Sequence, residues 1–347
     1  MMHSREHDKK YRGLENLGNS CFLNSAFQAL YSVKPFRDYF GSDAWTNHRH
    51  ESVRGYELAG CTATLVQQLK EPGPPVRPTE FVRAFVSQAA DFDDALRQNS
   101  RQQADAGEAI QILLDLLHCQ QAREVKMSYT GKALTADQAE VVKSLESWTG
   151  FFRKEYSTLL DTFYGQTQKK IVCNACRTCS TSYEPWGVFK APIPSGSVAG
   201  APAPTFSECM AKALESETLD DFDCDTCKKK GPATIQLSIS KFPKYMIVSL
   251  LRFVATGAKI RCRIPYDENA VSLAPYRSWP SIQKDPVYRV ISTVEHLGGS
   301  RGGHYVMRTR ETEDGAWRIF DDDRVSMSPM AGAATPDTYI MILQLVV

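Results

Sequence analysis

Two Cys-x-x-Cys pairs limit what this chain can fold into more than any other feature. CNAC occupies residues 173–176 and CDTC occupies residues 224–227, with 47 residues between them. Each pair can direct two thiolates at one metal ion, and two pairs complete the closed, four-sulfur tetrahedral shell that suits structural Zn²⁺. We therefore expect the segment between the pairs to loop out and return to the same metal. The expected zinc ligands are Cys173, Cys176, Cys224 and Cys227.

A redox dithiol, or a set of unrelated buried thiols, is the alternative interpretation of these pairs. Cys179 lies three residues after Cys176, so it is a competing ligand candidate that we interpret as a spare thiol. Four further cysteines stand singly among mixed or apolar neighbours, and we expect them to be small buried side chains. These are Cys61, Cys119, Cys209 and Cys262.

The first residues of the chain, its apolar runs and its charge indicate the compartment and the partners of the protein. The first residues, MMHSREHDKKYR, lack the apolar stretch of a signal peptide, and no apolar run reaches the roughly 18 residues of a membrane span. We therefore expect an intracellular protein of the cytoplasm or nucleus with no membrane partner. In that reducing compartment, clustered cysteines are metal ligands or catalytic thiols rather than disulfides. The 41 Lys and Arg residues balance 40 Asp and Glu residues, which argues against a nucleic-acid partner.

The apolar pattern changes from helical to strand-like along the chain, which predicts an α+β fold. Helical spacing follows Ser20, and AIQILLDLLH (109–118) is apolar enough to be a buried helix. Residues 120–150 carry no sharp signal. Further helices are expected at 57–69, after Thr79 and at 206–214. Strands are expected at 234–240, 245–253, 287–296, 304–310, 316–321 and 338–346.

Cys21 differs from the other cysteines because it opens a helix. It follows Gly18-Asn19-Ser20 and precedes an apolar stripe at helical spacing. A thiol in the first turn of a helix faces unpaired backbone N–H groups and the positive end of the dipole, and both favour the thiolate. Cys21 is therefore a candidate nucleophile, which needs a base elsewhere in the chain.

The best candidate for that base is His304, which starts the strand HYVMRTR after the glycine-rich LGGSRGG. Residues 304–310 and 315–321 should form a hairpin around ETEDG. With a two-residue loop, His304 lies directly opposite Asp321, and an aspartate beside a histidine fixes its tautomer. A one-residue slip would substitute Asp322. The order Cys, His, carboxylate is that of papain-like cysteine proteases.

Several ordered motifs resemble those of the ubiquitin-specific proteases. The resemblance covers residues 11 to 347. Its motifs are YRGLENLGNSCFLNSAFQAL (11–30) for the Cys box, QADAGEAIQILLDLLH (103–118) for the glutamine/aspartate box, and YRVISTVEHLGGSRGGHYVMRTR (288–310) with WRIFDDDRVS (317–326) for the His box. FPKYMIVSLLRF (242–253) and IPYDENAVSLAPY (264–276) resemble two further family segments, and the Cys-x-x-Cys pairs match the family's zinc site.

The resemblance implies a role for each matching residue. Cys21 would be the nucleophile, His304 the general base and acid, and Asp321 the residue that orients His304. Asn16 would donate to the oxyanion, and Asp322 would be a second, assisting acid. Loss of one oxyanion donor typically costs about 10²–10³ in rate.

A substrate site is implied as well. Asp105 and Glu108 match acidic positions that contact arginines in the ubiquitin tail, and the tail's Gly-Gly end would thread between the glycine-rich segment and the Cys21 helix. The box departs from the family's pattern, because it lacks the usual second glutamine and the Phe-Leu after the glutamate. Gly107 also weakens its helix by about 1 kcal/mol relative to alanine. The other expected substrate-binding residues are Gly298, Gly299, Gly302, Gly303 and Tyr305.

We thus expect a papain-like α+β fold with thumb, palm and zinc-braced β fingers. Residues 1–10 would be a flexible tail, and 11–347 a single catalytic domain without an adaptor. Within it the thumb would span about 11–160 and the fingers about 165–185 and 215–250, with the palm as the remainder. Ubiquitin or ubiquitinated proteins would be the partners of a monomer, with an activating partner as a further possibility.

Three alternatives remain open. The same fold and chemistry would serve another ubiquitin-like modifier. A non-catalytic scaffold would bind ubiquitin through the fingers without cleaving it, although the intact Cys21, His304, Asp321 and Asn16 argue against that. A zinc-ribbon nucleic-acid binder would show salt-dependent DNA binding, and the balanced charge argues against it.

Overall fold

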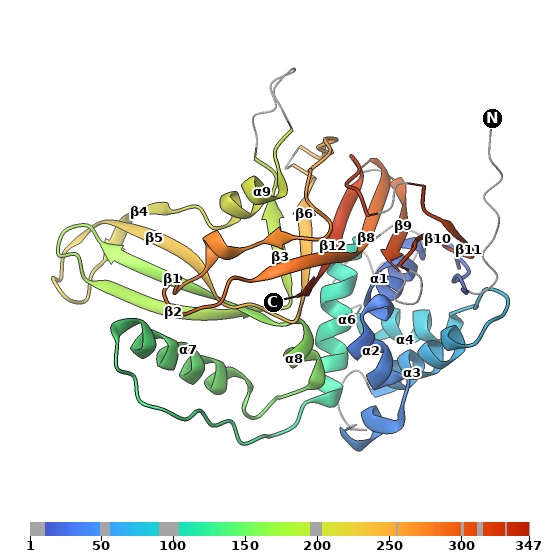
Figure 1. Cartoon of the computed structure of the whole chain (residues 1–347), viewed down its shortest axis with the longest axis horizontal. Coiled ribbons are helices and arrows are strands. Elements are labelled where there is room, and N and C mark those ends of the chain that lie inside the picture. Colours follow the sequence, from blue (N-terminus) through green and yellow to red (C-terminus); the bar gives the residue numbers. More distant parts are fainter. Residues whose placement is uncertain are drawn as a thin grey trace.

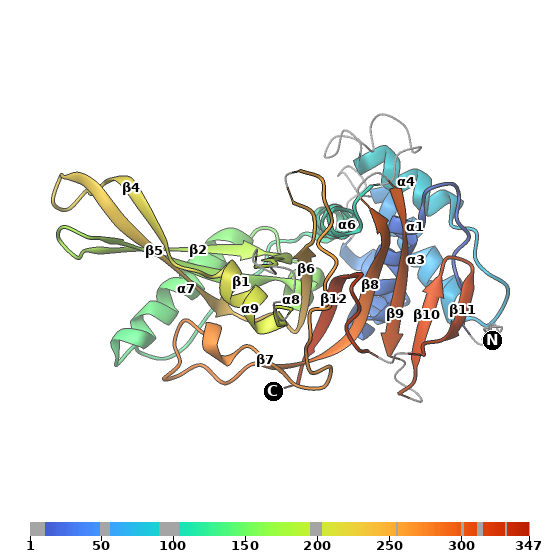
Figure 2. The ribbon, with the colours of Figure 1, turned by 90° about the horizontal axis from the view of Figure 1, so that it is seen from above.

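The chain folds into a group of helices, an eight-stranded sheet and a separate four-stranded sheet. Figure 1 and Figure 2 show the helices of the first 121 residues at one end of the molecule and the smaller sheet reaching away at the other. We call the sheets the palm sheet and the fingers sheet, and the helices of the first 121 residues the thumb helices. The computed structural model describes residues 11–48, 56–89, 104–194, 203–254, 256–299, 302–310, 315–329 and 332–346.

The thumb helices form where the apolar spacing predicts them. In α1, residues Leu23, Phe27 and Leu30 are buried, and α6 buries most of its length as its composition indicates. Asp105 starts α6 by accepting hydrogen bonds from the backbone N–H groups of Gly107 and Glu108. The elements are α1 (Cys21–Ser32), α2 (Lys34–Phe40), η1 (Asp43–His48), α3 (Tyr56–Lys70), α4 (Thr79–Ala89) and α6 (Ala106–Gln121).

The palm sheet places the second half of the chain against these helices. Its strand order is β11-β10-β9-β8-β12-β6-β3, and β7 pairs with β8. Only the β3–β6 pair is parallel among the pairs of the described strands. The strands are β3 (Val188–Pro192), β6 (Tyr245–Leu251), β7 (Val271–Ser272), β8 (Val287–Gly299), β9 (Gly302–Arg310), β10 (Trp317–Asp321), β11 (Arg324–Met327) and β12 (Thr338–Leu345).

The fingers sheet has the order β2-β1-β5-β4 and carries both Cys-x-x-Cys pairs at its strand ends. Strand β6 belongs to the palm sheet, so the fingers strands end at Lys241. The strands are β1 (Gly165–Cys173), β2 (Cys179–Trp186), β4 (Glu217–Asp223) and β5 (Lys230–Lys241). Helix α8 (Thr158–Phe163) precedes β1, helix α9 (Phe206–Ala213) lies between β3 and β4 in the chain, and the short η2 (Ala274–Tyr276) follows β7.

Two apolar clusters hold the palm sheet from its two faces. The larger joins α1, α6 and the other thumb helices to inward residues such as Val294, Met307 and Ile340. The smaller packs α9 against residues such as Val248 and Met341, which alternate with the first set along their strands. Burial on both faces explains why β6 and β12 are continuous apolar runs.

Helix α7 (Ala136–Phe152) is an element that the periodicity failed to predict. It lies along the fingers sheet (Figure 1) and is joined to it by buried polar contacts rather than by an apolar stripe. Ser144 Oγ donates to Gln166 Oε1 at 2.6 Å, and Tyr183 donates to the Glu140 carbonyl at 3.0 Å. The sequence did contain one signal, the capping box in which Thr135 caps the helix start.

The hairpin of β9 and β10 has a register two residues away from the predicted one. Trp317 pairs with Arg310 and Phe320 with Met307, because the connection is longer than two residues. A shift of two keeps each side chain on its face, since faces alternate with every residue. The predicted approach of His304 and Asp321 therefore survives as a diagonal contact.

The burial expected for the single cysteines is correct only for Cys209. Cys61 and Cys262 are partly exposed, and Cys119 is exposed near the end of α6. The prediction for Cys119 was wrong because its helix is buried on one side only at that end. In the described part of the chain, no helix combines the length and apolarity needed to cross a membrane.

Candidate functional site

His304 lies at the start of β9 against two consecutive aspartates at the turn after β10. Its Nε2 is 2.6 Å from Asp321 Oδ1 and 4.0 Å from Asp322 Oδ2. The shorter distance is that of a hydrogen bond, whereas two ligands of one metal ion would lie roughly 3.3 Å apart for bonds of about 2 Å. An Nε2–H held by Asp321 leaves Nδ1 as the nitrogen that can accept and return a proton.

Asp322 is the more enclosed of the two carboxylates, with 11% of its side chain exposed against 43% for Asp321. Asn16 Nδ2 donates to one carboxylate oxygen and Asn24 Nδ2 to the other, each at 2.8 Å. Burial raises the pKa of Asp322, and the two amide hydrogen bonds oppose that rise because they stabilise the carboxylate form. The Asp322 carbonyl also accepts from Leu14 N at 2.8 Å.

Asn24 is a site residue that the sequence analysis missed. It lies three residues after Cys21, so both side chains leave α1 on neighbouring faces. Through Asn24, the helix that begins with Cys21 is tied to the turn that holds His304. The only signal was a polar residue inside an apolar helix, and its partner lies 298 residues further along.

Cys21 begins α1 directly after a tight turn. Gly18 and Asn19 have φ values of +91° and +58°, a left-handed conformation that glycine and asparagine adopt most easily. Asn16 Oδ1 closes this turn by accepting from the backbone N–H groups of Gly18 and Ser20. Ser20 at the cap position makes no side-chain capping bond. The turn thus delivers the buried Cys21 thiol to an uncapped helix start, where the dipole favours a thiolate.

Helix α1 packs directly against β9, β8 and β10, the strands that carry and flank His304. The Asn16 side chain has two roles in this arrangement, because its oxygen shapes the turn before Cys21 while its amide nitrogen donates to Asp322. The structure therefore joins Asn16, His304, Asp321 and Asp322 directly, and places Cys21 at the end of the helix that packs beside them.

The described glycines of the glycine-rich segment pair with one another where β8 and β9 meet. Gly298 pairs with Gly303 and Gly299 with Gly302, so the ladder of the β8–β9 hairpin includes all four glycines. A Cβ atom on Gly303 would lie 2.4 Å from His296 Nε2, and one on Gly298 would lie 2.6 Å from the Gly303 Cα. These two glycines are required by the hairpin itself. Gly302 and Gly303 are exposed, beside His304.

His296, the other histidine near this hairpin, is unsuited to proton transfer. It is buried among the rings of Phe253, Tyr305 and Tyr339. Burial, with the nearby charge of Lys259, lowers the pKa of His296 to about 4, so its ring is neutral at physiological pH. Tyr305 is likewise buried, with burial raising its pKa, and the structure places it behind the hairpin rather than on a surface.

The expected acidic positions line a cavity of about 670 Å³ beside the start of α6. Asp105 and Glu108 lie on one wall, while β3, β6 and β12 supply the others. Both Asp105 oxygens already have partners, because Oδ1 caps α6 and Oδ2 accepts from the Tyr339 hydroxyl. Gly107 faces Ser249 closely, where a Cβ atom would be 3.2 Å from the serine hydroxyl.

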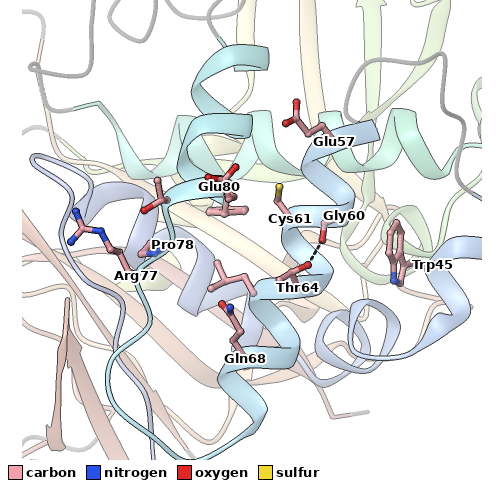
Figure 3. Close-up of a pocket in the computed structure, with 12 residues that line it drawn as sticks. Trp45, Glu57, Gly60, Cys61, Thr64, Gln68, Arg77, Pro78 and Glu80 are labelled. Atoms are coloured by element: carbon pink, nitrogen blue, oxygen red, sulfur yellow. Dashed lines mark hydrogen bonds between the residues drawn. The ribbon is translucent and has the colours of Figure 1, made fainter.

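A second cavity, of about 530 Å³, lies on the thumb between α3 and the start of α4. Figure 3 shows Cys61 pointing into it from α3, with Glu57 on the same helix and Glu80 facing across. Burial and the charges of these two glutamates raise the pKa of the Cys61 thiol. This thiol is therefore a poor nucleophile, and its cavity shares no residue with the His304 cluster.

The four predicted metal ligands converge at the tip of the fingers sheet. All four Sγ atoms lie within 4.8 Å of one another, with 3.6 Å between Cys176 and Cys224 and 4.0 Å between Cys173 and Cys227. Sulfurs around a tetrahedral zinc ion with bonds of about 2.3 Å lie roughly 3.8 Å apart. The cluster can therefore hold a metal ion of that size. Cys179 is exposed and not part of it.

The two Cys-x-x-Cys turns have the same backbone geometry. The carbonyl of Cys173 accepts from Arg177 N, and the carbonyl of Cys224 accepts from Lys228 N. Arg177 and Lys228 both have a positive φ, +61° and +54°. Two turns of one kind, supplied by different strand pairs, bring the four Sγ atoms into a single cluster.

A family model described as "Ubiquitin carboxyl-terminal hydrolase" matches residues 12–342 of the chain. The chain is 27% identical over 342 residues to ubiquitin carboxyl-terminal hydrolase 2 of Bos taurus, and 27% identical over 356 residues to ubiquitin carboxyl-terminal hydrolase 21 of Homo sapiens. These alignments cover 96% of this chain but only 55% and 61% of the relatives. The chain thus spans little more than half the length of the curated relatives it matches.

Among solved structures, the chain resembles a SAGA DUB module of Ubp8, Sgf11, Sus1 and Sgf73 bound to monoubiquitin, with a TM-score of 0.70 and 21% identity. It resembles the same module bound to ubiquitin aldehyde with a TM-score of 0.70 and 20% identity. Each alignment covers all of this chain and 72% of the other. At these identities the likeness confirms the predicted fold, an α+β arrangement of thumb, palm and fingers.

Proposed function

The chain belongs to the ubiquitin carboxyl-terminal hydrolase family, and from this we propose that it is a cysteine-type deubiquitinase. It would hydrolyse the isopeptide or peptide bond after the C-terminal glycine of ubiquitin. The observation that carries the proposal is the tie between two distant parts of the chain. Asn24, on the Cys21 helix, donates to Asp322, and the adjacent Asp321 holds His304 at 2.6 Å.

The proposed reaction uses Cys21 as the nucleophile. Its thiolate attacks the carbonyl carbon of ubiquitin's last residue, and His304 gives a proton from Nδ1 to the departing amine as the C–N bond breaks. Water, deprotonated by His304, then cleaves the thioester and restores the thiol. Asp321 keeps the Nε2 proton in place and stabilises the imidazolium that forms in each half-reaction.

Asn16 would stabilise the oxyanion together with the backbone N–H of Cys21. Among the described residues, only Asp322 accepts from the Asn16 amide nitrogen, so one N–H orients the amide and the other serves the substrate. This gives Asp322 an assisting role, because it aims the oxyanion donor. The cavity beside α6, with Asp105 and Glu108, would receive the basic ubiquitin tail, and the Gly298–Gly303 hairpin would flank its Gly-Gly end.

For the fingers we propose a structural zinc ion on Cys173, Cys176, Cys224 and Cys227. A closed four-thiolate shell leaves no open position for chemistry, so the metal would hold the tip of the fingers against ubiquitin's globular body. A monomer in a reducing, intracellular compartment fits the ten cysteines, none of which forms a disulfide. An activating partner is also part of the proposal, because one solved structure with this fold is a multi-subunit module.

Loss of one zinc ligand should destabilise the protein strongly. We expect Cys224→Ser to remove the bound zinc and lower the thermal midpoint by roughly 10 °C, since loss of a structural metal costs several kcal/mol. Zinc content per chain and a thermal melt are the measurements. Cys179→Ser is the matched control and should keep one zinc and the parent midpoint. Equal zinc content in the Cys224 variant would refute the assignment.

The substrate is tested with C-terminal fluorogenic amides of ubiquitin and of other ubiquitin-like modifiers. We expect kcat/KM for the ubiquitin amide to exceed that for the other modifiers by at least about 10²-fold, because the carboxylates of Asp105 and Glu108 would pair with the basic side chains of the ubiquitin tail. A preference for another modifier would assign the same chemistry to that substrate. Ubiquitin binding without turnover of any amide would instead support the non-catalytic scaffold.

A further inference from the structure

Lys259 has a buried side chain whose ammonium group contacts two backbone carbonyls and one carboxylate near the glycine hairpin. Only 2% of the side chain is exposed. Its Nζ donates to the carbonyl of His296, contacts the carbonyl of Gly298 at 3.5 Å and donates to Asp337 Oδ1 at 2.7 Å. An ammonium has three donors, and burying it is costly unless they are used. Because a buried ammonium group is costly, we ask what the contacts of Lys259 with two backbone carbonyls contribute.

The two carbonyls stand on either side of Leu297, and Leu297 is the residue of β8 that pairs with His304 on β9. Lys259 thus holds the stretch of β8 backbone that pairs with His304. Asp337 binds the same stretch of backbone, because its own carbonyl accepts from His296 N at 2.9 Å. The backbone of His296 is therefore tied at both its N–H and its carbonyl to one ion pair.

Other contacts fix the segment that carries Lys259. Arg252, fully buried at the end of β6, donates to the carbonyls of Ile260 and Cys262 at 2.9 and 3.0 Å, and to that of Thr338. Arg261 donates to the Gly298 carbonyl at 2.5 Å. The segment after β6, the end of β8 and the start of β12 are thereby joined through cations and carbonyls. Asp337 is the one carboxylate that these contacts include.

The glycine content of the hairpin explains why contacts from Lys259 would be needed there. Four of its residues are glycines, which have the largest backbone freedom and no side chain with which to pack. On its other side His304 is held by Asp321, whose side chain is 43% exposed. A mobile tip would let His304 leave its productive position, whereas carbonyls fixed by a buried cation hold it there.

We propose that Lys259 is a positioning residue for His304, which acts through the two carbonyls that flank Leu297. This inference rests on the proposed function. In this proposal the segment after β6 helps to position His304, the general base. No side chain of that segment contacts the reacting atoms.

The test compares Lys259→Met, which keeps the length but loses the donors, with Lys259→Arg, which keeps the charge. With the ubiquitin amide we expect Lys259→Met to lower kcat roughly 10- to 100-fold, the range that a misplacement of about 1 Å costs, with KM changed less than about twofold. Lys259→Arg should recover most of kcat. The matched control is Lys70→Met, since Lys70 also donates to a carbonyl, that of Gly41 at 2.7 Å, on the thumb. It should have parent kcat.

An unchanged kcat in Lys259→Met, or a rise in KM alone, would overturn the proposal. So would a loss that Lys259→Arg does not recover at all while its thermal midpoint equals that of the parent. If Lys259→Met does not fold, Asp337→Asn decides, because it removes the charge but keeps an oxygen acceptor. We expect it to lower kcat several-fold, and a parent kcat would count against the proposal.

Hydrogen exchange separates this inference from the proposed function. In Lys259→Met, the amides of Leu297 and His304 should exchange at least about tenfold faster than in the parent, because the end of the ladder opens more often. Parent-like exchange there would contradict the positioning role. Should the parent protein hydrolyse no ubiquitin amide, the proposed function fails, and the exchange result still decides whether Lys259 holds the hairpin.

Discussion

Cys21→Ala should reduce hydrolysis of a ubiquitin C-terminal amide by about 10⁶-fold, the loss seen when a nucleophile that acts with its base as a unit is removed. The reason is local. Without the sulfur there is no thioester, and neither His304 nor Asn16 can supply one. Binding of ubiquitin should stay within about twofold of the parent, because Cys21 is small and buried at the helix start. Steady-state kinetics and a binding titration measure the two effects.

Cys61→Ala is the matched control for this variant. Cys61 also lies on a thumb helix, but burial and two glutamates raise its pKa, and it lines a cavity that contains neither Cys21 nor His304 (Figure 3). We expect parent activity from it. If Cys21→Ala kept full activity, Cys21 could not be the nucleophile, and a comparable loss in Cys61→Ala would point to a general effect on folding.

His304→Gln should lower kcat by about 10²–10⁴-fold, which is the usual contribution of a general acid–base group. Glutamine can hydrogen-bond but cannot carry the proton between nucleophile and leaving group. Asp321→Ala should lower kcat by at least about 10-fold but by less than His304→Gln, because His304 keeps its proton-carrying nitrogen and loses only its orienting partner. The measurement is kcat at a pH where the parent is most active.

Asp323→Ala is the control for charge in this acidic run, since Asp323 is exposed and lies outside the cluster of His304, Asp321 and Asp322. Parent activity is expected from it. If Asp323→Ala and Asp321→Ala fell equally, the effect would come from the summed charge of the turn. If His304→Gln retained kcat within about twofold, another group would be the base.

Local chemistry was enough to predict the elements whose cause is local. The apolar stripe after Cys21 and the apolar run of α6 became helices. The four clustered cysteines lie two to a tight turn, as the Cys-x-x-Cys spacing indicates, and the pairing of β1 with β5 brings the two turns together. Helix α7 was not predicted, because polar contacts such as that of Ser144 with Gln166 attach it to the fingers sheet. Hydrophobic periodicity gives no sign of such contacts. The hairpin register was wrong by two because loop length is weakly encoded, but the face was right.

The contacts that assemble the site depend on residues far apart in the chain. Asn24 meets Asp322, and Lys259 meets Asp337, only once the palm sheet has formed. A single asparagine in an apolar helix, or one lysine after a strand, gives no local sign of its partner. The burial of Tyr305 behind the hairpin was hidden for the same reason, since strand alternation alone does not tell which face meets the thumb helices.

The central claim is that Cys21 forms the covalent bond with the ubiquitin C-terminus. Ubiquitin with an electrophile in place of its last carboxylate should react with the native protein, and the site can be mapped by mass spectrometry of the digested adduct. We predict one adduct per chain, on Cys21, and none in Cys21→Ala. An adduct on another of the ten cysteines, or no adduct with ubiquitin bound, would contradict it.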